Sequence, residues 1–130
     1  MASLSELYRA HLKAWAEGDV ETALSYMAED IMWYPNRAMR PIVGKQAVRD
    51  FVAKFARGME NISFTQTHMI EHGNILFVEG VESYTKVGKQ VNTPYAGVVE
   101  WRDGQAVNWR DYFDLKTLDA QLADHTSTTR

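Results

Sequence analysis

The chain has 130 residues, of which 45% are hydrophobic and 24% charged, and its formal net charge at pH 7 is -3. This composition is typical of one soluble globular domain with its own core, and the weak negative charge gives no reason to expect a nucleic acid or an anionic membrane as partner. The absence of cysteine excludes disulfides, thiol catalysis and cysteine-ligated metals.

No apolar run is long enough to span a bilayer, and the N-terminal residues lack a secretory pattern, so we expect a cytoplasmic protein. We predict a single domain over residues 1–124. Residues 125–130 are polar and are expected to form a flexible tail.

Helical patterns dominate the first half of the chain. Ser3 and Glu6 have capping-box spacing, and apolar residues then recur at helical spacing until Gly18. A second, shorter helix is predicted after Asp19, and a third between Gly44 and Gly58. His11 falls on the apolar stripe of the first helix, where a histidine is more often a core residue than a catalyst.

The second half has the pattern of strands. A short apolar run at residues 31–34 precedes the third helix, and residues 62–70, 75–84, 93–101 and 107–114 follow as longer strands. Short turns at residues 72–74, 87–89 and 103–104 predict an antiparallel meander, and leucines at 115, 118 and 122 predict a short last helix. We therefore expect an α+β fold, in which a cone-shaped, curved antiparallel sheet packs against three N-terminal helices and encloses a pocket.

Residues 107–114 carry the main functional signal. Side chains alternate between the faces of a strand, so Trp109, Asp111 and Phe113 share the apolar face. A buried carboxyl group has a raised pKa, in the range useful for proton transfer. A structural acid or a position on a wet rim explains Asp111 about equally well.

Glu82 is a second candidate for an inward acid, and paired carboxyls in unlike environments can act as acid and base. An exposed position on the strand is an equal alternative for Glu82. Tyr34 and Asn36 end the short strand, where they could orient a water, although a core tyrosine and a turn asparagine are the commoner roles. His68 and His72 are a weak metal signal, and we predict no metal and no cofactor.

Three segments resemble one family. Residues 109–114 (WRDYFD) look like the last-strand motif of the limonene epoxide hydrolase branch of the SnoaL-like proteins, which belong to the nuclear transport factor 2-like (ketosteroid isomerase-like) superfamily. Tyr34-Pro35-Asn36 resembles its Tyr-x-Asn pair, and Ala96-Gly97-Val98 lies at a matching distance before Trp109. The resemblance covers residues 4–122.

The resemblance implies roles for individual residues. Asp111 would be the general base that activates a water held also by Tyr34 and Asn36, and Glu82 would stand in the place of the acid. The family's arginine that bridges the two acids is replaced by Gly80, which we expect to leave extra pocket volume. The pocket-lining, substrate-binding residues implied are His11, Tyr84, Thr93, Tyr95, Trp109 and Phe113.

These features predict a small-molecule pocket protein for an uncharged apolar or alicyclic substrate. The first hypothesis is an epoxide-hydrolase-like enzyme that activates water with Asp111. The alternatives are polyketide-cyclase-like or isomerase-like proton transfer, with His11 donating to an oxygen, and a non-catalytic binding module. The steroid isomerase reaction itself is rejected because the corresponding positions carry His11, Tyr34-Pro35 and Ala96. We also expect a homodimer through the sheet face that carries Ile75, Phe77 and Val81, extended by Val99 and Trp101.

Overall fold

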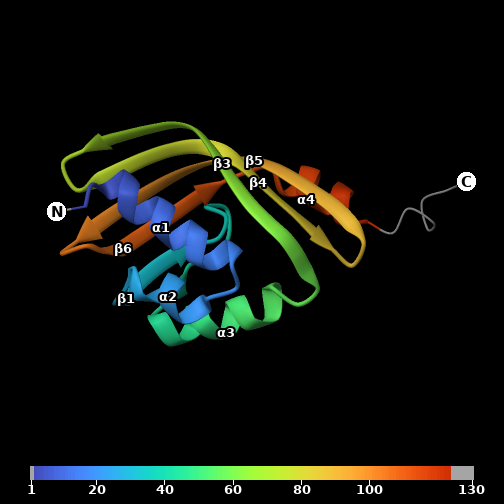
Figure 1. Cartoon of the computed structure of the whole chain (residues 1–130), viewed down its shortest axis with the longest axis horizontal. Helices are drawn as coiled ribbons and strands as arrows, with labels where there is room; N and C mark the ends of the chain where they lie inside the picture. The colour runs from blue at the N-terminus through green and yellow to red at the C-terminus, as the bar shows by residue number, and fades with distance from the viewer. Residues whose placement is uncertain (1, 124–130) are drawn as a thin grey trace, which may run out of the picture.

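A computed structural model describes residues 2–123 as one curved sheet with helices packed against its concave face (Figure 1). The helices are α1 (Leu4–Ala16), α2 (Val20–Ser25), α3 (Lys45–Phe55) and α4 (Leu115–Leu122). The strands are β1 (Met27–Tyr34), β2 (Ile42–Val43), β3 (Met59–His72), β4 (Ile75–Lys86), β5 (Lys89–Arg102) and β6 (Gln105–Tyr112). Their order across the sheet is β2-β1-β6-β5-β4-β3, and the sheet does not close on itself. The α+β prediction is confirmed, whereas the predicted tail lies outside the described residues.

The helix starts follow the signals in the sequence. The Ser3 hydroxyl accepts a hydrogen bond from the Glu6 amide at 3.1 Å, and the Glu6 carboxylate accepts one from the Ser3 amide at 2.9 Å, which is a complete capping box. Asp19 caps α2 through the Thr22 amide. No helix within residues 2–123 is long and apolar enough to cross a membrane.

Strands β3 to β6 form the predicted antiparallel meander. The β5–β6 turn places Asp103 and Gly104 at φ 51° and 80°, the left-handed pair that a tight hairpin requires. A parallel pairing joins β1 to β6, with Trp33 opposite Trp109. The local sequence did not indicate this pairing, because no turn connects the two strands.

The two faces of the meander differ in composition. Leu76, Val99 and Trp101 are at most 3% exposed on the inner face, where they pack against α1 and α2 residues of the core. The expectation that Val99 and Trp101 extend the outer apolar face was therefore wrong, because the inward residues of β5 are the odd-numbered ones. Phe77 does lie on the outer face and is 44% exposed.

Candidate functional site

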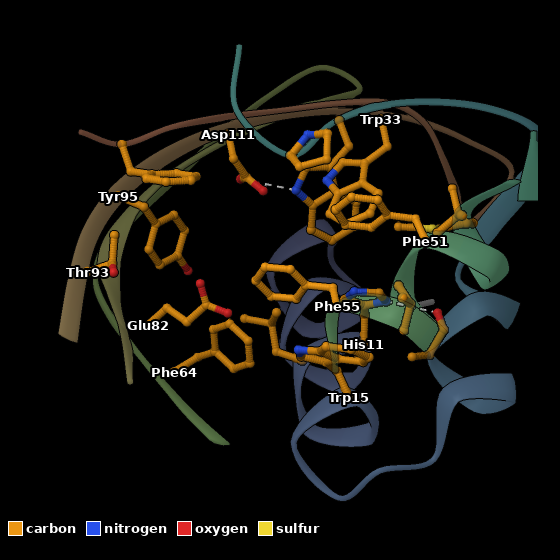
Figure 2. Close-up of a pocket in the computed structure, with 18 of the residues that line it drawn as sticks. His11, Trp15, Trp33, Phe51, Phe55, Phe64, Glu82, Thr93, Tyr95 and Asp111 are labelled. Atoms are coloured by element: carbon orange, nitrogen blue, oxygen red, sulfur yellow. Dashed lines mark hydrogen bonds between the residues drawn. The ribbon is translucent and has the colours of Figure 1, made fainter. Parts of the chain in front are cut away.

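A cavity of about 390 Å³ lies between the concave face of the sheet and the helices. Its wall is mostly aromatic and aliphatic, with a few polar groups on the sheet side (Figure 2). No lysine or arginine of residues 2–123 lines it, and no cluster of potential metal ligands is found in this part of the chain. Such a wall is typical of a small-molecule pocket.

Asp111 enters the cavity from β6, as its place in the alternating strand predicted. Its Oδ1 accepts a hydrogen bond from the indole Nε1 of Trp109 at 3.3 Å. Burial and, to a smaller extent, the charge of Glu82 raise the pKa of Asp111 to about 7, against the opposing effect of the Trp109 and Trp33 side chains. Asp111 therefore exchanges a proton near neutral pH.

Glu82 enters the same cavity from β4, and Figure 2 shows both carboxyl groups pointing into the central space from the sheet wall. Burial raises the pKa of Glu82 to about 7. Without a cation in the cavity wall, the two carboxyl groups interact electrostatically, so their protons are gained and lost by the pair and not by each group independently. The site can thus keep one acid and one base at the same pH.

Gly80 does not add volume to the cavity, contrary to our expectation. A Cβ atom at Gly80 would lie 2.4 Å from the Thr65 carbonyl oxygen and 3.2 Å from the Gln66 Cα, both in the backbone of β3. The register of β3 shifts between Gln66 and His68, and there the strand crosses close over β4. The space that a side chain would fill is occupied by main chain, so no arginine fits at Gly80.

Gly97 has a different role, next to the candidate base. It is the β5 partner of Asp111, and a Cβ there would lie 3.0 Å from the Asp111 Oδ1 and 3.0 Å from the Val78 side chain. Glycine at this position leaves the space in which the carboxyl group lies.

His11 lines the cavity but is not a hydrogen-bond donor to it. Its Nδ1 lies 2.8 Å from the Ala23 carbonyl oxygen, which places the proton on Nδ1, and its ring lies 4.8 Å from that of Trp109. Burial lowers the pKa of His11 to about 4, so the ring is neutral at pH 7. Nε2 is then an acceptor, which corrects the expectation that His11 donates to a substrate oxygen.

The structure does not bring Tyr34 and Asn36 to the cavity wall. The Tyr34 hydroxyl donates to the Met32 sulfur at 3.5 Å. Asn36 is 4% exposed, and its amide donates to the Phe113 carbonyl oxygen at 2.7 Å and accepts from the Ala38 amide at 2.9 Å. Asn36 thus connects the loop after β1 to the end of β6, and its side-chain oxygen and nitrogen both already have hydrogen-bond partners within the protein.

Every predicted substrate-binding residue lines the cavity, although the substrate contacts themselves stay predictions. Sequence reasoning missed a second group of aromatic residues in the cavity wall, which lie on the helices α1 and α3 and on the sheet strands β1 and β3. These side chains are Tyr8, Trp15, Trp33, Phe51, Phe55 and Phe64. The helical spacing of the residues on α1 and α3 was interpreted only as a core stripe, because in a cone the helix face that covers the core also covers the cavity.

The sequence and the fold both identify relatives of this chain. Residues 8–109 match the SnoaL-like domain. The chain belongs to the SnoaL-like domain family. A candidate SnoaL-like polyketide cyclase from Shewanella denitrificans OS-217 is 19% identical over 91% of this chain and 95% of its own, with a TM-score of 0.82.

Two further solved structures share the fold of this SnoaL-like domain. A limonene-epoxide-hydrolase-like (LEH-like) epoxide hydrolase from M. tuberculosis is 21% identical over 95% of this chain and 94% of its own, with a TM-score of 0.77. A nuclear transport factor 2-like protein of unknown function from Burkholderia pseudomallei K96243 is 21% identical over 95% of this chain and the whole of its own, with a TM-score of 0.83. At these identities the likeness establishes the fold alone, and the chemistry has to be argued from the site.

Proposed function

We propose that this SnoaL-like protein is an acid–base enzyme that moves a proton on an uncharged, largely apolar small molecule. Asp111 is the general base and Glu82 the general acid. The observation that carries the proposal is the pair of half-buried carboxyl side chains that line one apolar cavity, each with a pKa of about 7. Catalytic acids and bases work best when the pKa lies near the working pH.

The assignment of base and acid follows from the neighbours of each carboxyl group. The indole of Trp109 donates to Asp111, and donors of this kind stabilise the charged form. The pKa of Glu82 is shifted by burial alone, so nothing in its surroundings favours its charge. Because both pKa values are about 7, we assign the shared proton to Glu82 and the charge to Asp111 on the ground of this indole donor.

The reaction we favour is proton transfer next to a carbonyl group. Asp111 takes a proton from the carbon, the C–H electrons form a carbon–carbon double bond, and the carbonyl oxygen takes the proton of Glu82. The enol then returns its O–H proton to Glu82 while Asp111 delivers a proton to carbon. The two carboxyl groups end as they began, and the substrate has exchanged a proton at carbon or, where the proton returns to another carbon, has become an isomer.

Epoxide hydrolysis is the second candidate, supported by an acid and a base that face one cavity. In that reaction Asp111 would activate a water and Glu82 would protonate the epoxide oxygen. The positions of Tyr34 and Asn36 count against it, since both side chains are bonded elsewhere. A non-catalytic binding module is the third reading, and it predicts neither reaction.

One experiment separates these readings. We would follow deuterium uptake from D₂O into 2-tetralone by NMR, and ¹⁸O uptake from labelled water into limonene oxide by mass spectrometry. We expect deuterium uptake that Asp111→Asn abolishes and Glu82→Gln reduces about 10²-fold or more, whereas the exposed control Asp119→Asn leaves it unchanged. Exchange that survives Asp111→Asn would reject the proposal, and ¹⁸O uptake alone would favour the hydrolase.

A further inference from the structure

Two tyrosine hydroxyls meet on the polar side of the cavity. Tyr8 comes from α1 and Tyr95 from β5, and their oxygen atoms are 2.7 Å apart. Tyr95 stands opposite Gly80 in the β4–β5 register, and Glu82 is two residues further along β4. Figure 2 shows the Tyr95 hydroxyl directed into the cavity on the same side as the Glu82 carboxyl group. The mechanism above makes no use of this pair.

The pair leaves one hydroxyl proton free. A hydroxyl has one proton, so a single hydrogen bond between two hydroxyls uses only one of their two protons. Tyr8 is 1% exposed and has no second hydrogen bond within residues 2–123, so a free proton on Tyr8 would be buried without an acceptor. Tyr8 is therefore the donor, and the proton of Tyr95 points elsewhere.

The surroundings of Tyr95 keep that proton in place for a ligand. Burial raises the pKa of Tyr95 to about 12, so the hydroxyl stays protonated at neutral pH. The side chains of Tyr8 and Gln66 oppose this rise in pKa, as hydrogen-bond donors to the Tyr95 oxygen do. Gln66 of β3 lies opposite Gly80 of β4, and Gly80 in turn lies opposite Tyr95 of β5. Because Gly80 has no side chain, none stands between Gln66 and Tyr95. A hydroxyl that already accepts from its neighbours has its own hydrogen available for the cavity.

We propose that Tyr95, positioned by Tyr8, donates the hydrogen bond that binds the substrate's carbonyl oxygen, so that the cavity selects cyclic ketones. This inference rests on the proposed function and adds the substrate class and the orientation. The oxygen end lies at the sheet wall near Glu82, and the hydrocarbon rings lie against the aromatic side chains of the helices, including Trp15, Phe51 and Phe55.

The infrared spectrum of a bound ketone tests the hydrogen bond directly. With 2-tetralone labelled with ¹³C at the carbonyl, we expect the wild-type protein to lower the carbonyl stretching frequency relative to an apolar solvent. Tyr95→Phe should abolish the lowering and weaken binding about 3- to 10-fold. Tyr8→Phe should reduce the lowering in part, because Tyr95 loses the neighbour that orients it. Tyr112→Phe, on the exposed outer face, is the matched control and should change nothing.

Each outcome decides a separate point. An unchanged carbonyl band in Tyr95→Phe, or no binding of 2-tetralone to the wild-type protein at millimolar concentration, would overturn the inference. A lowered band without deuterium uptake would retain Tyr95 as the binding group and reject Asp111 as the base. Deuterium uptake with an unshifted band would retain Asp111 and reject Tyr95.

Discussion

Gly97 and Asp111 lie opposite each other on β5 and β6, and the carboxyl group occupies the space that a Gly97 side chain would need. A Cβ atom there would be 3.0 Å from the Asp111 Oδ1 and equally close to Val78. The position of the candidate base thus depends on a residue that has no functional group of its own.

We predict that Gly97→Ala displaces the Asp111 carboxyl group. The variant should lose about 1–3 kcal/mol of stability from overpacking, and kcat for deuterium uptake should fall about 10- to 100-fold with little change in KM. Steady-state kinetics and urea unfolding measure the two effects. Ala96→Ser, at an exposed neighbouring position, is the control. Full activity in Gly97→Ala would show that the space is not needed.

A second prediction concerns the pH dependence of stability. The pKa of Glu82 is about 7 in the folded protein and near 4.5 when unfolded, so between these values the folded state binds more protons. The free energy of unfolding therefore falls as the pH rises through this range. Glu82→Gln removes the loss and should be more stable than the wild type by about 3 kcal/mol at pH 8, with a smaller difference at pH 4. Unfolding curves that differ equally at both pH values would contradict the raised pKa.

A third prediction concerns Thr93, the cross-strand partner of Glu82. Its hydroxyl is buried and has no hydrogen-bond partner within residues 2–123, an arrangement that costs free energy. Thr93→Val should raise the free energy of unfolding by about 1 kcal/mol, as measured by thermal unfolding. A loss of stability would mean that the hydroxyl is bonded in solution.

A fourth prediction concerns assembly. The outer face of the sheet exposes Ile70 at 65% and Phe77 at 44%, and the two residues are paired across β3 and β4. An apolar surface of this kind is typical of an interface, and we expect a homodimer in sedimentation velocity at micromolar concentration. Phe77→Lys should shift it to monomer, whereas Val87→Lys, in the β4–β5 turn, should not. A monomeric wild-type protein would refute the expectation.

The sequence predicted those features of the site that local rules determine. The Asp103-Gly104 turn and the alternation of β6 placed Asp111 inside. The face on which Glu82 lies stayed open, because β4 carries apolar residues on both faces. Features that depend on distant backbone were not predictable. Gly80 is required by a β3 backbone that crosses close to it, and Asn36 is held by the Phe113 carbonyl, 77 residues away. A hydrogen bond between residues so far apart in the sequence cannot be predicted from the local spacing of residue types.

The most direct test of the central claim is a pH titration of the carboxyl carbons by ¹³C NMR, which needs no substrate. We predict two carboxyl signals with apparent pKa values of about 7, one lost in Asp111→Asn and the other in Glu82→Gln. Each variant should also change the titration of the signal that remains, because the two groups interact. If every carboxyl group instead titrates below pH 5, Asp111 and Glu82 are ordinary ionised acids, and the acid–base proposal is wrong.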